Sequence, residues 1–429
     1  MAKLDLSAHY DSQATALAAD GEDAFAAVRR DALARFRELG LPSKRDEAWR
    51  YTETRALSRR AFLPAALLPG EPPTVPAAHE LLDPMYELLI VDGRLVRCDA
   101  PVSLRALSRG DAVTAPTAQY DDGLAALQSA FLSDLIEIEL APGARLERPL
   151  LIRRQSSSPA SSPRIACPTL RISLGAGADL ILVEQQIGTP GSEDLDSVSL
   201  DLMLADAATL DWTRMRVGAA AGYRIDRCRA SLGRNSRLRA SHLDLAGHWN
   251  RSDLRVVLAG AGASVALDGL YLPQGTDLHD HHLEVVHAVP HTRSAQRYRG
   301  VLSGTSRAVF SGRVLIEAGA QHADASQENR NLLLSEGAEV DTKPELEIYA
   351  DDVKASHGAT VGQLDEASMF YLLSRGLDRE TARALLVFAF ADTVLTGLPS
   401  NALRLYVEAQ LVAALPNAEV LSDAAGVRA

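Results

Sequence analysis

Hydrophobic and polar positions at the start of the chain follow several short patterns, which together indicate a mixed N-terminal unit over residues 1–134. Between Gly21 and Gly40 apolar residues recur at close to helical spacing, so a helix is predicted there. A proline-rich stretch at 68–80 is typical of a linker. Alternating residues around Asp92-Gly93 predict a hairpin, and a short helix is expected at 123–132.

The period changes to two in the middle of the chain and returns to that of a helix near its end. Residues 135–364 contain short runs in which apolar and polar residues alternate, as in strands with one buried face. Residues 365–429 have helical spacing again, and Asp378 and Ser400 are candidate N-caps for two of three expected helices. The chain is therefore expected to be mainly β, with helical domains at both ends.

A weak internal repeat runs through residues 135–364. Each copy has a leucine, a small or glycine-rich bend and another aliphatic residue, as in "LGAGADL" and "LSGTSRAV". The steps between successive leucines are 34, 30, 28, 26, 44 and 32 residues. Stacked coils have repeats of this kind, because one coil cannot bury its apolar face until a neighbour covers it. The repeated residues are Leu140, Leu174, Leu204, Leu232, Leu258, Leu302 and Leu334.

A β-solenoid, in particular a parallel β-helix, is the fold that this pattern favours. A helical solenoid has similar periods but needs runs of about ten or more residues at helical spacing, whereas "LDLAGHWNRSDLRVVL" alternates. An antiparallel β-sandwich is the alternative, because alternation within single strands does not distinguish the two folds.

Composition and charge narrow the possible functions. Of 429 residues, 47% are hydrophobic and 23% are charged, so the chain can bury a large core. The formal net charge of -12 argues against nucleic acid or an anionic membrane as the main partner, because both select for clustered lysine and arginine. The N-terminus lacks the pattern of a secretory signal, and no apolar stretch is long enough to cross a membrane, so a cytoplasmic protein is expected. Cys98, Cys167 and Cys228 form no C-x-x-C pair and are expected to be ordinary reduced thiols.

The densest group of histidines lies in "DLHDHHLEVVHAVPH", between His279 and His291. On a strand His279 and His281 would share one face, so two imidazoles could bind a transition metal, with Glu284 as a candidate third ligand. The spacing matches no metal motif, and hydrogen-bonded histidines on a sheet face or at an interface are the alternative. A metalloenzyme that uses this cluster is the second hypothesis for the function.

Other polar segments carry less chemistry. In "AQHADASQENRNLLLS", Asn329 and Asn331 share one strand face, where stacked amides would satisfy one another's donors and acceptors. Ser356 and His357 are adjacent and would point to opposite faces of a strand, so they form no nucleophile and base pair. No phosphate loop of the G-x-x-x-x-G-K type occurs, and the chain itself is not expected to hydrolyse ATP.

The segment "DDVKASHGATVG", at 351–362, concentrates candidate chemistry at the end of the β region. His357 precedes a path of small residues where the chain leaves its last β layer, and Asp351, Asp352 and Lys354 could tune its proton affinity. The residues by themselves leave two interpretations open, a reactive histidine and a structural polar cap.

Three stretches carry a resemblance to a known family. They are Ala320 to Phe390, the preceding "DLHDHHLEVVHAVPHTRSAQRYRGVLSGTSRAVFSGRV", and "LPSKRDEAWRYT" near the N-terminus. All three resemble the SufB/SufD family of iron-sulfur cluster assembly scaffold proteins, and "SHGAT" with the short N-terminal segment is typical of its SufD branch. The resemblance spans both ends and most of the second half of the chain. The middle of the chain agrees with the family only in its general pattern of short alternating runs and tight bends.

The resemblance implies a fold and a set of partners. The family's fold is a right-handed parallel β-helix between helical N-terminal and C-terminal parts. SufD members pair with SufB through the edges of the two β-helices, and the C-terminal helices of each are held by the ATPase SufC, which binds the ATP. By this resemblance the helix from Asp378 to Leu398 and the residues before it would face the ATPase. The candidate contacts are Arg375, Leu386, Phe388 and Phe390.

The resemblance also assigns a role to His357. In the family, the histidine of this motif faces SufB and takes part in building the nascent iron-sulfur cluster. Many SufD members have a cysteine two residues earlier, where this chain has Ala355. The expected protein is a non-enzymatic scaffold in which His357 is a transient metal ligand at the SufB interface, with no cofactor held stably by this chain alone. An isolated chain could form a homodimer through the same edge, and a self-assembling structural protein is a third hypothesis.

Overall fold

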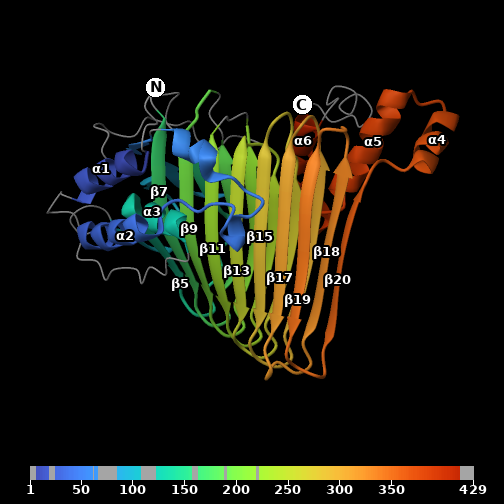
Figure 1. Cartoon of the computed structure of the whole chain (residues 1–429). Helices are drawn as coiled ribbons and strands as arrows, with labels where there is room; N and C mark the ends of the chain where they lie inside the picture. Colours follow the sequence, from blue (N-terminus) through green and yellow to red (C-terminus); the bar gives the residue numbers. More distant parts are fainter. Residues whose placement is uncertain are drawn as a thin grey trace, which may run out of the picture.

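Two sheets wound into successive coils form the body of the molecule (Figure 1). The computed structural model describes residues 6–18, 25–60, 62–65, 85–107, 122–156, 163–187, 191–218 and 222–415. From residue 132 onward, consecutive strands alternate between the two sheets, and neighbouring strands within each sheet are parallel. The resulting β-solenoid has about seven turns, which confirms the predicted fold class and excludes the antiparallel sandwich.

Each sheet contains ten strands, and the two are called sheet A and sheet B below. The order in sheet A is β19 (Glu339–Ile348), β17 (Arg307–Ile316), β15 (Leu278–His287), β13 (Trp249–Leu258), β11 (Tyr223–Leu232), β9 (Leu195–Leu204), β7 (Arg164–Leu174), β5 (Leu132–Leu140) and β4 (Ser103–Leu107), with β1 (Leu63–Pro64) beside β7. The order in sheet B is β20 (Lys354–Gly362), β18 (Asp324–Leu333), β16 (Arg293–Leu302), β14 (Ser264–Tyr271), β12 (Arg237–Asp244), β10 (Thr209–Val217), β8 (Asp179–Ile187), β6 (Leu150–Gln155), β2 (Tyr86–Val91) and β3 (Arg94–Cys98).

Leucines at the ends of the sheet A strands stack inside the solenoid. Leu174 pairs in register with Leu204, and Leu232 pairs with both Leu204 and Leu258. All four are buried in one apolar cluster between the sheets. In-register parallel pairing places equal positions of successive coils above one another, so one leucine per coil builds a continuous core.

Of the eight turns that lead from sheet A to sheet B between β5 and β20, all but the last contain a residue with positive φ. For six of these seven residues the amide donates to a carbonyl of the next coil, as from Asn235 to Ala261 at 3.0 Å and from His322 to Asp352 at 2.6 Å. Glycine adopts this conformation without steric cost, and other side chains rarely do. The residues are Gly143, Gly177, Ala207, Asn235, Gly262, His291 and His322.

The repeat predicted from the sequence combines two different corners of the solenoid. The first five leucines, up to Leu258, end strands of sheet A, and in the next coil Leu258 pairs with His287. Leu302 instead ends a strand of sheet B and pairs with Leu333. The prediction is therefore wrong for Leu302 and Leu334, and the long step of 44 residues marks the change of corner. The sequence pattern does not distinguish the two corners, because at both of them a strand ends in an aliphatic residue and is followed by a bend of small residues.

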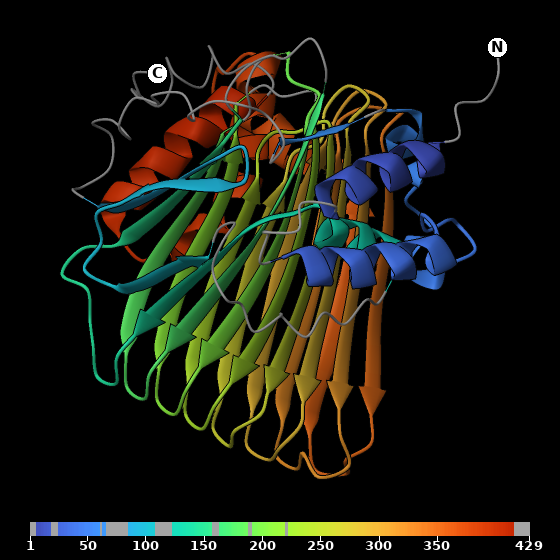
Figure 2. The ribbon, with the colours of Figure 1, turned by 90° about the vertical axis from the view of Figure 1, so that its left-hand side faces the viewer.

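Three helices at the N-terminal end cover the outer face of sheet A (Figure 2). They are α1 (Leu6–Ala18), α2 (Ala26–Leu39) and α3 (Gly123–Ala130), with 3-10 turns η1 (Glu47–Trp49) and η2 (Thr54–Arg59) between α2 and β1. The predicted helix before Gly40, the hairpin at Asp92-Gly93 and the short helix are confirmed. The proposed linker at 68–80 lies outside the described residues. Strands β2, β3 and β4 extend both sheets.

The predicted C-terminal helices are also confirmed. They are α4 (Glu366–Ser374), α5 (Arg379–Asp392) and α6 (Asn401–Ala414), with the 3-10 turn η4 (Leu395–Gly397) before α6. The Asp378 carboxylate caps α5 by accepting from the Thr381 amide at 2.9 Å, and the Ser400 hydroxyl caps α6 by accepting from the Leu403 amide at 3.1 Å. Helices α5 and α6 pack on the outer face of sheet B. Among the described helices, none has the length and apolar character needed to cross a membrane.

Candidate functional site

The solenoid ends at β19 and β20 with no further coil over them (Figure 1). His357 of β20 pairs in register with Gln327 of β18, and Ala355 pairs with Ala325. The side chains of Gln327 and Ala325 are buried inside the solenoid. Residues in register face the same side of a sheet, so His357 and Ala355 also point toward the interior. His357 is nevertheless exposed, since nothing stacks on its coil.

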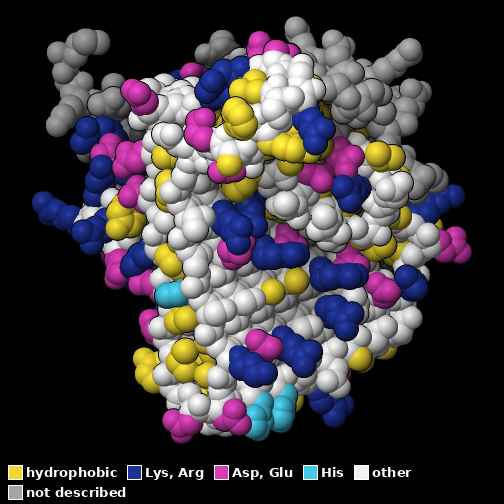
Figure 3. Space-filling view, turned by 90° about the vertical axis from the view of Figure 1, so that its right-hand side faces the viewer, with side chains coloured by type: hydrophobic (Ala, Val, Ile, Leu, Met, Phe, Trp, Pro, Cys, Tyr) yellow, Lys and Arg dark blue, Asp and Glu magenta, His cyan; other side chains and the backbone are white. Residues whose placement is uncertain are grey.

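Apolar side chains surround this uncovered coil. Leu346 of β19 is in register with the buried Val314, yet it is only partly buried itself. Ile348, Tyr349 and Val361 are 41%, 65% and 49% exposed. Figure 3 views the molecule from the side on which β20 lies, and hydrophobic side chains appear at its surface among charged ones. We call β19, β20 and Tyr349 the open end.

The opposite end of the solenoid is closed. There β3 and β4 run antiparallel to their neighbours β2 and β5. Leu95, Val102 and Leu104 from this region pack against the interior core. An uncovered sheet edge offers unpaired N–H and C=O groups to another chain, and proteins usually cover or bend such edges. The chain protects one end of its solenoid in this way and leaves the other end open.

His357 itself has no hydrogen bond or ion pair to any of the described residues, so its imidazole is free to bind a ligand. The Asp352 carboxylate contacts another histidine, at 2.9 Å from Nδ1 of His322. The ring of His322 stacks on His291 at a centroid distance of 4.8 Å. Beneath His357, the Gln327 side chain donates to Oε1 of Gln296 at 2.9 Å.

Few other metal ligands lie near His357. It is the single histidine of β19 and β20, neither strand contains cysteine, and Ala355 on the same face has no donor atom. Within the described ranges, no group of three or more His, Cys, Asp or Glu side chains is arranged to hold a metal ion. Cys167 and Cys228 are buried, and burial raises the pKa of both thiols well above the usual value. The open end therefore offers one imidazole, and a metal there needs further ligands from another molecule.

The histidine cluster does not form the metal site that the second hypothesis requires. His279 and His281 are buried inside the solenoid, whereas Glu284 lies on the other face of β15 and forms ion pairs with Arg255 and Arg313 at 2.9 and 2.7 Å. Residues five apart on a strand face opposite sides, so the three cannot meet. Burial lowers the pKa of His281 to about 3. Among the described residues this cluster therefore forms no metal site, and the metalloenzyme hypothesis is wrong for it. The alternative of hydrogen-bonded histidines fits His279 and His287, which are buried and hydrogen-bonded.

The side-chain amides of Asn329 and Asn331 form hydrogen bonds with each other and with Tyr271. The expected stacking of amides from successive coils is not what satisfies them. Asn331 donates to Oδ1 of Asn329 at 2.6 Å, Asn329 donates to the Tyr271 hydroxyl at 3.0 Å, and that hydroxyl donates to Asn331 at 2.5 Å. Tyr271 reaches this position because its neighbour in the next coil is Gly300. All three side chains are buried. Because each is hydrogen-bonded to the other two, burying their polar groups costs little free energy.

Comparison with known proteins decides the family. The model of the SUF system FeS cluster assembly SufBD core domain matches residues 154–390, and the model of the SufBD N-terminal region matches residues 2–63. The chain belongs to the SufBD family. It is 27% identical to the iron-sulfur cluster assembly protein SufD of Escherichia coli (strain K12), across 88% of this chain and 90% of the relative. It is also 28% identical to an iron-sulfur cluster assembly SufBD family protein of Synechocystis sp., across 85% and 86% of the two chains.

In this SufBD protein the candidate partner contacts of the C-terminal helices differ in exposure. Phe388 and Phe390 of α5 pack partly against the cluster on sheet B, and the Arg299 guanidinium carbon lies 5.6 Å from the centroid of the Phe390 ring. Phe370 and Tyr371 of α4, which were not singled out in the sequence, are 73% and 56% exposed. Leu386 is partly buried, and Arg375 is exposed with its guanidinium carbon 5.1 Å from the centroid of the Tyr371 ring. The most exposed apolar surface of these helices therefore lies on α4.

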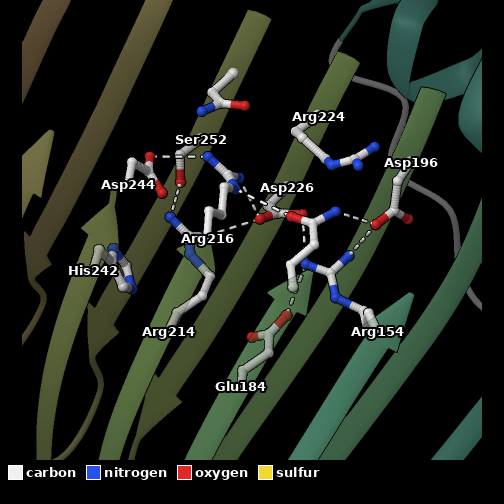
Figure 4. A network of polar contacts seen from close by, with 12 residues as sticks. Arg154, Glu184, Asp196, Arg214, Arg216, Arg224, Asp226, His242, Asp244 and Ser252 are labelled. Atoms are coloured by element: carbon white, nitrogen blue, oxygen red, sulfur yellow. Dashed lines mark hydrogen bonds and ion pairs between the residues drawn. The ribbon is translucent and has the colours of Figure 1, made fainter. Parts of the chain in front are cut away.

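A network of buried charges inside this SufBD solenoid was not predicted (Figure 4). Arg154 pairs with Glu184 at 2.9 Å and with Asp226 at 3.2 Å, and Arg216 pairs with Asp226 and, at 2.9 Å, with Asp244. All of these residues are almost completely buried. Burial by itself would raise the pKa of Asp226, but Arg216 and Arg154 hold it below its usual value. Alternation assigns charged strand residues to the outside, so the sequence pattern contains no signal for these inward arginines and aspartates.

Proposed function

We propose that this chain is a non-catalytic scaffold subunit for iron-sulfur cluster assembly, which pairs through its open end with a second SufBD-type chain, SufB. The observation that carries the proposal is the uncovered last coil with His357 on its interior-facing side. The family of the chain and the family resemblance of the "SHGAT" segment support the same assignment.

The open end has the chemistry of a subunit interface. A strand of the partner placed beside β20 or β19 would continue the hydrogen-bond ladder that stops there. The same contact would remove Leu346, Tyr349 and Val361 from water. An isolated chain could cover the end with a second copy of itself, so a homodimer of the lone subunit agrees with this proposal.

Within that interface His357 would act as a ligand for iron. A neutral imidazole is a suitable ligand for iron, and a site with few fixed ligands allows the finished cluster to leave. Iron and sulfide are the cargo here, and the remaining ligands, including any thiolate, would come from the partner because Ala355 has no sulfur. We expect no cofactor held stably by this chain alone.

The C-terminal helices would bind the ATPase SufC. In such a complex ATP is bound by SufC and not by this chain. Exposed aromatic rings surrounded by solvent are typical of binding surfaces. Phe370 and Tyr371 on α4 form such a surface next to Arg375, and Leu386, Phe388 and Phe390 of α5 lie on the following helix. In this arrangement α5 connects the ATPase contact to the solenoid, since its inner side packs on sheet B.

The test is coexpression of the chain with SufB and SufC under anaerobic conditions, followed by purification through a tag on this chain. We expect a complex of the three proteins that assembles clusters. His357→Ala should leave the complex intact and lower the bound iron and sulfide by about tenfold or more, because the interface loses an iron ligand. His322→Ala, which removes an exposed histidine outside the two end strands, is the matched control. Unchanged cluster content in His357→Ala would contradict the role assigned to the imidazole.

The interface has a separate matched pair of variants. Val361→Asp places a charge in the open end, and Val96→Asp places one on β3, at the closed end. Both positions are partly exposed, so both variants should fold. We expect Val361→Asp to lose SufB on size-exclusion chromatography and Val96→Asp to retain it. Retention of SufB by both variants would show that pairing uses another surface.

A further inference from the structure

One row of interior positions in sheet B changes character as it approaches the open end. In-register pairing places one residue of each strand on this row, all facing the inside of the solenoid. In the earlier coils the row is apolar and belongs to the core between the sheets. In the last coils it becomes polar, with two glutamines followed by a histidine. From β8 to β20 the residues are Leu182, Trp212, Ala240, Leu267, Gln296, Gln327 and His357.

The two glutamines of this row are buried. Gln296 is 1% exposed and Gln327 is 4% exposed. Burying an amide costs free energy unless its donors and acceptors find partners. One bond is made, from Nε2 of Gln327 to Oε1 of Gln296 at 2.9 Å. The chain therefore keeps two amides at positions where apolar residues, as in the earlier coils, would cost less.

The Gln327 side chain lies in a space left by a glycine of sheet A. A Cβ atom at Gly312 would lie 2.2 Å from Nε2 of Gln327. Gly312 is in register with Leu283, whose side chain belongs to the interior core. A larger residue at position 312 would thus displace the amide. Gly312 and Gln296 together fix the Nε2 end of the Gln327 side chain.

The other polar atom of this amide is left without a partner. Oε1 of Gln327 is buried and accepts no hydrogen bond from any described residue. Only the last coil lies beyond Gln327 in the stack, and the residue in register there is His357. The imidazole of His357 also has no hydrogen bond or ion pair within the described part of the chain. Nε2 of Gln296 is unmatched as well, but β18 lies between it and His357.

A buried acceptor therefore lies next to an imidazole that can donate to it. Neighbouring strands are about 4.8 Å apart, so rotation of the exposed His357 side chain can bring a ring nitrogen to Oε1 of Gln327. A neutral imidazole has one N–H group and one nitrogen with a lone pair. Histidines that bind metals almost always donate their second nitrogen to an acceptor of the protein, which fixes the tautomer and the ring orientation.

We propose that Gln327 is a positioning residue for His357, whose ring N–H donates to Oε1 of Gln327. This bond leaves the lone pair on the other ring nitrogen, which points away from β18 toward the partner side of the open end. The inference rests on the role of His357 as an iron ligand proposed above, and it adds the residue that orients the imidazole.

Nitrogen-15 spectra of the histidine side chains test the contact in the isolated full-length chain. At about pH 8, where imidazole side chains are ordinarily neutral, the nitrogen shifts distinguish the two tautomers. His357→Ala identifies the signals of His357. We expect one tautomer of His357 in the unmodified chain and a mixture of both in Gln327→Met, which keeps the length of the side chain and loses the amide oxygen. The same mixture in both proteins would overturn the proposal.

Three further variants separate the contact from a change in the fold. Gln327→Glu keeps an acceptor oxygen and should retain the single tautomer. Combining Gln296→Met with Gln327→Met leaves no amide unpaired, so this double variant should fold and should show the mixture. Gln186→Met changes a glutamine of β8 that is 3% exposed and should leave the His357 signals unchanged. A single tautomer in the double variant, or a mixture in Gln186→Met, would contradict the assignment to Gln327.

The cluster content of the complex tests whether this contact serves the proposed function. After coexpression with SufB and SufC, Gln327→Met should lower bound iron and sulfide by about tenfold, and Gln327→Glu should recover most of the loss. If His357→Ala lowers the cluster content and Gln327→Met does not, the positioning role is wrong while the proposed function stands. If neither variant lowers it, the proposed function is wrong, and the positioning role fails with it.

Discussion

Trp49 offers the sharpest test of how the N-terminal segment is attached to the solenoid. This residue lies in the "LPSKRDEAWRYT" segment and is 1% exposed on the outer face of sheet A. The guanidinium carbon of Arg251 lies 3.8 Å from the ring centroid of Trp49, and the indole N–H donates to the Asp122 carboxylate at 2.9 Å. Close by, the Thr52 hydroxyl and Arg251 both donate to the buried Asp280. Replacement of Trp49 by alanine removes all of these contacts of the ring, whereas replacement by phenylalanine removes only the N–H donor and part of the ring.

The expected losses follow from these contacts. Trp49→Ala removes a buried indole and leaves a cavity, which costs about 3–5 kcal/mol of unfolding free energy. A desolvated cation–π contact contributes about 2 kcal/mol of that amount. Trp49→Phe keeps most of the ring and loses the hydrogen bond to a charged acceptor, which costs about 1.5–3 kcal/mol. Alanine at the exposed neighbour Arg50 should change stability by no more than about 0.5 kcal/mol.

Urea unfolding at 25 °C, followed by circular dichroism, measures these differences. The order of midpoints should be Arg50→Ala, then Trp49→Phe, then Trp49→Ala, with an unchanged slope against urea. A double-mutant cycle with Arg251→Ala should give a coupling energy of about 0.5–3 kcal/mol. Equal midpoints for Trp49→Ala and Arg50→Ala would refute the reasoning, and zero coupling would show that the ring does not depend on Arg251.

Three further predictions concern other parts of the molecule. A Cβ atom at Gly300 would lie 2.2 Å from the Tyr271 ring, so Gly300→Ala should cost about 1–3 kcal/mol or more in urea unfolding, whereas Gly358→Ala, with nothing within 4 Å, should be nearly neutral. Burial lowers the pKa of His287 to about 4, so unfolding takes up a proton as the pH falls from about 6.5 to 4. Native stability should decrease by up to about 3 kcal/mol over that window, and less so in His287→Gln; equal pH profiles would contradict this account. Phe370→Ser should weaken binding of SufC without changing the Tm, while Leu405→Ser on α6, which is 57% exposed, should do neither.

The repeat shows what alternation can and cannot predict. Period two and tight small-residue bends identified coils correctly, because each coil has to bury one face against the next. They did not identify the corner to which each bend belongs. Leu258 and Leu302 look alike in the sequence, yet one ends a strand of sheet A and the other a strand of sheet B. Only the pairing of Leu258 with His287 separates them.

The interior shows a second limit. The same pattern that buries leucines also turns Arg154, Arg216 and Asp226 inward, where the sequence alone suggests solvent. Buried charges are tolerated only when partners lie within ion-pair distance, and these partners come from different coils and from both sheets. A single sequence has no local signal for such pairs, since their separation along the chain depends on the length of every coil between them.

The sequence by itself determined the β-solenoid, the helical ends with their capping residues, and His357 as the candidate ligand near the end of the β region. These depend on local periodicity, on residues that cap or terminate helices, and on a motif shared with a family. The tertiary structure decided that His357 faces the interior of an uncovered coil, that His279 and His281 are buried, and that charged residues such as Arg154 and Asp226 form ion pairs inside the solenoid. These properties depend on register and on which coil ends the stack, and neither is encoded within a few neighbouring residues.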